Sequence, residues 1–152
     1  MRNDVLAYVV GFTLLIFAVP LFLMVAVGFF LGDNDIILQS FLLPGVISAV
    51  LGSLLVHWGQ GRGASSERLR DREAFAAVAL GWPVVVIIGA LPFWFGGMFH
   101  GPFELISGQS NLTEVLGGSV RAFFESMSGF TTTGATVIDP RTSPVCQPAV
   151  PD

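Results

Sequence analysis

Three long stretches without charged side chains constrain the fold of this chain more than any other feature of its sequence. Residues 5–31 run for 27 positions, residues 36–58 for 23 and residues 74–95 for 22 without an Asp, Glu, Lys or Arg. A helix needs about 20 residues to cross the hydrocarbon core of a bilayer. We therefore expect three transmembrane helices rather than helices buried in a soluble core.

The overall composition agrees with a membrane protein. Of the 152 residues, 53% are apolar and only 12% are charged, about half of the charged fraction usual in soluble domains. The seven basic residues, all arginines, and the 11 acidic ones are too few to cover a soluble domain of this length. This composition excludes an ordinary soluble enzyme, a disordered tail and a basic protein that binds nucleic acid.

The distribution of arginines predicts how the helices are oriented. Residues 59–73 contain four of the seven arginines, whereas the short turn at residues 32–35 contains none. Loops rich in Lys and Arg stay in the cytoplasm. We therefore expect a multi-pass protein of the cell membrane, with the two helices of residues 1–58 starting in the cytoplasm, a cytoplasmic loop at 59–73 and a third helix at 74–95.

The sequence offers no candidate catalytic or metal centre. The three apolar stretches carry no charged residue, so they contain no proton-coupling group of the usual kind. Paired carboxylates, a nucleophile with a base and a cluster of metal ligands are not recognisable, and the predicted topology places His57 and His100 at opposite faces of the membrane. We expect neither an enzyme nor a bound cofactor.

The region after the third stretch indicates a helix that enters the membrane and returns. Residues 96–118 are too long for a structureless connector, and we expect them to be extracellular. Ser119 is a candidate cap for a short helix at 119–129 that ends at Gly129. Such a helix rises about 15 Å, half of the hydrocarbon thickness, so it cannot cross.

A threonine-rich stretch at residues 130–138 follows this short helix. Non-helical backbone at membrane depth is tolerated where it lines a water-filled cavity. There, carbonyl oxygens and threonine hydroxyls can replace the hydration shell of a cation, and the carboxyl end of the preceding helix favours a positive charge. The alternative interpretation is a threonine-rich surface turn.

Two strings in this part of the chain resemble a known family. The strings DREAFAAVALGWPVVVIIGALPFWFGG and RAFFESMSGFTTTGATV resemble the first pore repeat of the Trk/Ktr/HKT potassium transporters, and within them the Trk-type subunits. The resemblance implies an all-α integral membrane protein with three transmembrane helices, a re-entrant pore helix and a filter strand. These parts would form one incomplete repeat of a pore that resembles potassium channels and has four repeats in one chain.

The resemblance also assigns candidate potassium-binding residues. Gly134 matches the single glycine of the family's filter, and the ion-facing carbonyl groups would belong to Thr131, Thr132, Thr133 and Gly134. Ala135 and Thr136 would continue toward the outer mouth.

Two acidic residues lie close to this filter in the sequence. For Glu125 we favour a structural role over direct contact with an ion, through an ion pair with Arg121 or a hydrogen bond to backbone behind the filter. Asp139 would lie at the outer mouth and concentrate cations there; an ordinary loop acid is the equal alternative.

The last segment, residues 139–152, departs from the family pattern. It contains four prolines and no apolar run, which excludes the inner helix that the family places after the filter. We expect a truncated Trk-type potassium uptake protein that is inactive alone. The alternative is a non-transporting accessory or interaction protein of the membrane. By resemblance, full-length relatives form homodimers and bind a cytosolic nucleotide-binding regulatory subunit.

Overall fold

The computed structural model describes residues 3–32, 37–60, 71–139 and 143 of the chain. Three of its helices are long and apolar enough to cross a membrane, as the sequence predicts: Asn3–Leu31, Leu38–Gln60 and Asp71–Phe95. The first is α1, the second consists of the π-helical turn η1 (Leu38–Leu42) and α3 (Leu43–Gln60), and the third is α4. The arginine-rich loop at 61–70, the turn at 33–36 and most of the proline-rich tail lie outside the described residues.

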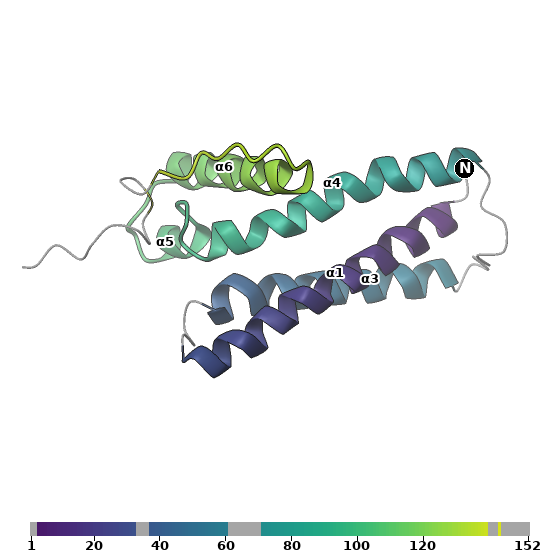
Figure 1. Ribbon diagram of the computed structural model, residues 1–152, viewed down its shortest axis with the longest axis horizontal. Coiled ribbons are helices and arrows are strands. Elements are labelled where there is room, and N and C mark those ends of the chain that lie inside the picture. The colour runs from purple at the N-terminus through teal and green to yellow at the C-terminus, as the bar shows by residue number, and fades with distance from the viewer. Residues whose placement is uncertain (1–2, 33–36, 61–70, 140–142, 144–152) are drawn as a thin grey trace, which may run out of the picture. The chain divides into compact units, whose positions relative to one another are not determined.

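The chain divides into two compact units. The first comprises Met1–Gly32 and Phe41–Val85, and the second comprises Asp33–Ser40 and Val86–Asp152. In the first unit α1 and α3 lie side by side and cross (Figure 1).

Glycines allow α1 and α3 to approach each other closely. A Cβ atom added at Gly52 would lie 2.8 Å from the carbonyl oxygen of Gly11, and one added at Gly59 would lie 2.7 Å from that of Asp4. One helical turn before Gly52, the fully buried Ser48 donates a hydrogen bond of 2.8 Å to the carbonyl oxygen of Leu14. Small residues at such a crossing let two backbones pack closely in a membrane, where no hydrophobic effect drives the helices together.

The π-helical turn η1 is explained by the proline that follows it. Pro44 has no N–H, and in an α-helix its ring would collide with the carbonyl group four residues earlier, that of Ser40. The wider turn of a π-helix at Leu38–Leu42 surrounds this carbonyl and lets the helix continue into α3. Pro20 lies inside α1, and transmembrane helices tolerate internal prolines of this kind.

The second unit contains the end of α4 and two further helices, α5 (Pro102–Ile106) and α6 (Leu112–Phe130). Its core consists of Ala90 on α4, Phe99 in the connecting loop and the fully buried Ala122 on α6. Ser126 on α6 donates a hydrogen bond of 2.7 Å to the carbonyl oxygen of Val86 on α4. The packing thus fixes α6 against the carboxyl-terminal half of α4.

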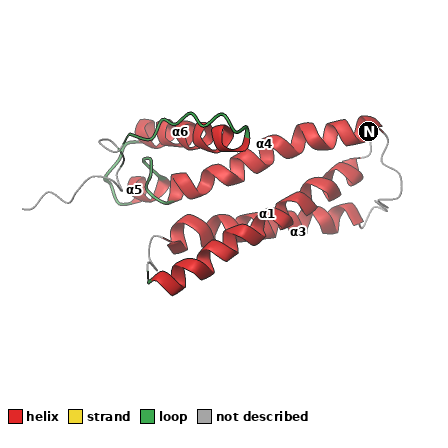
Figure 2. Cartoon of the chain, in the orientation of Figure 1, coloured by secondary structure: helices red, strands yellow, loops and turns green. Residues whose placement is uncertain are grey.

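The structure corrects the predicted bounds of the short helix. The sequence analysis starts it at Ser119 and ends it at Gly129, but α6 begins seven residues earlier, at Leu112, and ends at Phe130. With 19 residues, α6 is about 28 Å long rather than 15 Å, so its length alone does not prevent it from crossing. The segment 96–118, which is too long for a structureless connector, contains α5 and the first two turns of α6. No strand is present among the described residues (Figure 2).

Candidate functional site

The amino end of α6 is fixed by a cap that the sequence analysis overlooks. Asn111 is the N-cap residue, and its backbone N–H donates a hydrogen bond of 2.9 Å to Oε2 of Glu114. This contact is one arm of a capping box, in which a carboxylate satisfies an N–H group at the helix start. Ser119, the predicted cap, lies inside the helix, where its hydroxyl bonds to the carbonyl oxygen of Leu116 at 2.8 Å.

At its carboxyl end, α6 stops in a tight turn formed by threonines. Thr131 is the C-cap residue, and both its N–H and its hydroxyl donate to the carbonyl oxygen of Met127, at 2.9 and 2.8 Å. Thr132 follows with φ at +56° and Gly134 with φ at +70°. Both values lie in the left-handed region, which glycine adopts freely and a β-branched residue rarely does. The turn ends at Thr132, and the non-helical backbone after it begins at Thr133, three residues later than the predicted filter start at Phe130.

After this turn the chain runs back along α6 instead of leaving it. We call residues 133–139 the return segment; Figure 1 shows it as the yellow-green trace beside α6. The hydroxyl of Ser128 on α6 donates to the carbonyl oxygen of Ala135 at 2.6 Å. Further along, Ile138 packs against the core of the second unit. A helix and an extended segment that run in opposite directions give the chain the form of a hairpin.

One glutamate holds the return segment along much of its length. Oε1 of Glu125 accepts hydrogen bonds from the hydroxyl of Thr136 at 2.8 Å and from the backbone N–H groups of Val137 at 2.5 Å and Ile138 at 3.2 Å. An ionised acceptor makes such bonds stronger than neutral ones. The contacts are of the structural kind that the sequence analysis favours for this residue; within the described residues no ion pair joins it to Arg121.

The predicted filter residues lie on the turn and on the start of the return segment. Residues 131–137 are all exposed in this chain. The hydroxyls of Thr131 and Thr133 lie 2.8 Å apart, while the Ala135 carbonyl and the Thr136 hydroxyl are bonded toward α6. Asp139 is exposed at the end of the segment, and its carbonyl oxygen accepts a hydrogen bond of 2.9 Å from the N–H of Ser143.

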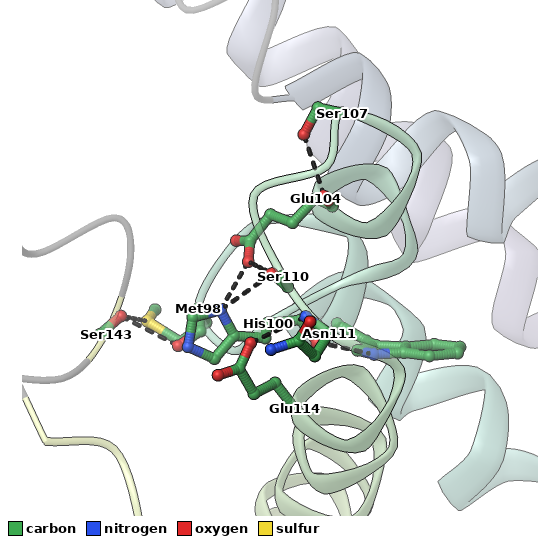
Figure 3. Close-up of polar contacts among 9 residues, drawn as sticks. Met98, His100, Glu104, Ser107, Ser110, Asn111, Glu114 and Ser143 are labelled. Carbon is green, nitrogen blue, oxygen red and sulfur yellow. Dashed lines mark hydrogen bonds and ion pairs between the residues drawn. The ribbon is translucent and has the colours of Figure 1, made fainter.

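A second polar cluster, which the sequence analysis does not anticipate, lies between α5 and α6 (Figure 3). Oε2 of Glu104 lies 2.6 Å from Nδ1 of His100 and accepts a hydrogen bond of 2.7 Å from Ser110. The Ser110 hydroxyl also lies 3.4 Å from the same ring nitrogen, Nδ1. A catalytic Ser–His–acid relay uses the two different nitrogens of the ring, so this cluster does not have the geometry of a hydrolase site. The four-residue spacing of His100 and Glu104 is the sequence signal that could have found it, although His100 lies before the start of α5.

A metal centre is not formed by the residues that the structure describes. Among them, no three His, Cys, Asp or Glu side chains come together as ligands. Oxygen atoms of the turn after α6, from carbonyl groups and threonine hydroxyls, are the groups there that suit a weakly held cation.

Together these features define an all-α membrane protein in which an amphipathic helix is followed by a segment that folds back on it. Comparison with known proteins identifies the class more closely. The chain is 38% identical over 100 residues to the Trk system potassium uptake protein TrkH of Escherichia coli strain K12, a match that covers 66% of this chain and 17% of that protein. TrkH of Salmonella typhimurium matches to the same extent.

A second uptake protein gives a shorter match. The Trk system potassium uptake protein TrkG of Escherichia coli strain K12 is 37% identical over 75 residues, which is 49% of this chain and 12% of TrkG. No family model and no solved structure matches the chain. The chain is thus a partial homologue of the Trk-type potassium uptake proteins, and its match spans about one sixth of the length of TrkH.

Proposed function

We propose that this chain contributes one potassium-conducting segment to a Trk-type transporter in the cell membrane. The observation that carries the proposal is the hairpin of α6 and the return segment, with Glu125 bonded to three donors of the segment from the helix side. The turn at residues 131–134 is exposed, so no element within the described part of the second unit covers its threonine oxygens. The homology to TrkH and TrkG supplies the ion, potassium.

The chemistry of the turn suits a cation that loses part of its water. Thr131 and Thr133 offer hydroxyl oxygens 2.8 Å apart, and the carbonyl groups of residues 131–134 add further acceptors. The carboxyl end of α6 lies at the same turn, and its partial negative charge favours a cation. Carbonyl and hydroxyl oxygens together can replace a hydration shell, as they do in selectivity filters. In this proposal Glu125 orients the segment and does not contact the ion.

The finer parts of the proposal follow from the resemblance. The amino terminus would be cytoplasmic, Asp139 would lie near the outer mouth, and a complete path would need further segments of the same kind. By resemblance, the partners would be a second copy of the transporter and a cytosolic nucleotide-binding regulatory subunit. The chain itself needs no cofactor in this proposal, since potassium is its cargo.

A chimera tests the proposal. The matching region of Escherichia coli TrkH is replaced by that of this chain, and potassium uptake is measured at limiting external potassium in a host that lacks its own uptake systems. We expect uptake by the chimera and a loss of about fivefold or more with Gly134→Ala, because a left-handed conformation costs a residue with a Cβ about 1–2 kcal/mol.

Gly129→Ala is the matched control. An added Cβ meets no atom within 4 Å at either glycine, but only Gly134 has a positive φ. The cause of the expected loss at Gly134 is its backbone conformation and not crowding by the added methyl group. Equal uptake by the two variants would contradict the filter proposal. A chimera that inserts but never transports would instead favour the accessory protein.

A further inference from the structure

A cavity in the second unit lies outside the hairpin that the proposed function uses. Its volume is about 160 Å³, and it is lined by the rings of Trp94, Phe95 and Phe103, the side chains of Gln39 and Glu104, and three glycines of the same loop. A water molecule in the liquid occupies about 30 Å³, so the cavity has room for a group of about five non-hydrogen atoms.

The three rings form a rigid wall. Trp94 and Phe95 are stacked with centroids 5.7 Å apart and an angle of 18° between their planes, and Phe103 meets Phe95 edge-on, at 5.7 Å and 65°. The indole N–H of Trp94 donates a hydrogen bond of 3.1 Å to the carbonyl oxygen of His100. Because the rings hold one another and the indole is bonded, little side-chain freedom is left to lose when a ligand binds.

The charge at this cavity is negative. Glu104 is the one charged residue among those that line it. Oε2 of Glu104 is engaged by Ser110 and His100, while Oε1 accepts no hydrogen bond from the described residues. The nearby basic side chain of Arg121 lines a different cavity. Aromatic faces beside a carboxylate attract a cation that carries alkyl groups, and quaternary ammonium ligands are recognised in this way.

The position of the cavity indicates where such a ligand would come from. Trp94 and Phe95 are the last two residues of the candidate span α4. Gln39 lies at the start of the candidate span Leu38–Gln60. Aromatic residues at span ends lie at the level of the lipid headgroups.

We propose that this cavity binds the ammonium group of a small organic cation, either a lipid headgroup or a free solute that contains choline. The ammonium would lie against the rings of Trp94 and Phe103, with the carboxylate of Glu104 as its counter-charge. This site is independent of the proposed potassium path.

Fluorescence of Trp94 tests the proposal. In the full chain with Trp58→Phe and Trp82→Phe, Trp94 is the one remaining reporter, and choline is titrated into the protein in detergent. We expect a saturable change in emission with choline and none with the neutral isostere in which carbon replaces the ammonium nitrogen. Phe103→Leu should weaken the affinity for choline about threefold to tenfold, the loss expected for one cation–π contact.

Phe75→Leu, at an α4 position that is 78% exposed and does not line the cavity, is the matched control and should leave the affinity unchanged. Phe95→Leu is a second test should Phe103→Leu lose helix content by circular dichroism. Equal responses to choline and to its neutral isostere, or an unchanged affinity in a folded variant, would overturn the proposal.

Lipid nanodiscs distinguish the two sources of the ammonium. A headgroup ligand predicts that Trp94 emission differs between phosphatidylcholine and phosphatidylglycerol discs and that added choline acts in the second only. A free solute predicts the same choline titration in both. If choline leaves Trp94 emission unchanged in both lipids and the lipids themselves give the same emission, the site does not exist.

Discussion

The contacts inside the first unit of the molecule differ in kind from those inside the second. In the first, α1 and α3 cross at glycines, and the bond from Ser48 to the carbonyl oxygen of Leu14 is a polar contact between them. In the second, Ser126 makes a similar bond to Val86, and carboxylates add further contacts. Glu125 bonds the return segment to α6, and Glu104 joins the loop around α5 to Ser110, just before α6.

This difference follows from the backbone N–H and C=O groups that need hydrogen-bond partners in each unit. The helices α1 and α3 satisfy their own N–H and C=O groups, so close packing is enough to hold them against each other. The return segment has neither a helix nor a partner strand within the described residues, so side chains must supply acceptors for its N–H groups. Polar residues therefore gather where the chain is irregular.

The largest expected effect concerns the crossing of the first unit. Gly52→Val adds a side chain whose Cβ would lie 2.8 Å from the carbonyl oxygen of Gly11. We expect this overpacking to cost about 3 kcal/mol, measured as loss of cross-linking between cysteines placed on α1 and α3. Gly81→Val is the control, because an added Cβ there meets no atom within 4 Å. If both variants cross-link like the parent, the glycines do not set the packing.

A smaller effect is expected when the carboxylate of the second unit is removed. Glu125→Ala leaves the N–H group of Val137 without its acceptor, at a cost of about 1–2 kcal/mol because the segment is partly exposed, whereas the N–H of Ile138 keeps the hydroxyl of Thr136 at 3.1 Å. Hydrogen exchange at the Val137 amide should become about tenfold faster and that at Ile138 should change less, while exchange on α1 should not change. Glu125→Gln keeps one oxygen acceptor and should fall between the parent and the alanine variant. Unchanged exchange at Val137 would contradict the role that we assign to Glu125.

The smallest effect has the opposite sign. Thr132 is a β-branched residue at φ +56°, and glycine at this position removes the strain of the left-handed conformation but adds freedom to the unfolded chain. We expect Thr132→Gly to stabilise the turn by about 0.5 kcal/mol, seen as slower amide exchange at Thr133. Faster exchange would mean that the threonine side chain stabilises the turn by more than its backbone costs.

The three spans could be predicted from the sequence because length and lack of charge decide them. The start of α6 was missed, although Asn111 and Glu114 have the spacing of a capping box, which the sequence shows. Two consecutive glycines, Gly117 and Gly118, lie inside α6 just before the predicted start at Ser119. In the structure Gly118 is helical and leaves room for the backbone of His100, whose carbonyl oxygen a Cβ would strike.

The sequence singles out the residues of the candidate site, but it does not state their contacts. The threonine-rich string and Gly134 are visible in the sequence, and one of them, Gly134, has the positive φ that its residue type allows. That Oε1 of Glu125 receives three bonds depends on how the chain turns at Thr132, which no spacing rule states. Likewise, His100 lies before α5 and Ser110 after it, so the approach of both residues to Glu104 depends on the path of the loop.

The bonds made by Glu125 also bear on how the hairpin forms. They join residues that are only 11, 12 and 13 positions apart in the chain, so closing them costs little chain entropy. Structures built from contacts of such short range form quickly. Once α6 is helical, the return segment can therefore dock onto it as the chain emerges during synthesis, before distant parts of the protein are available.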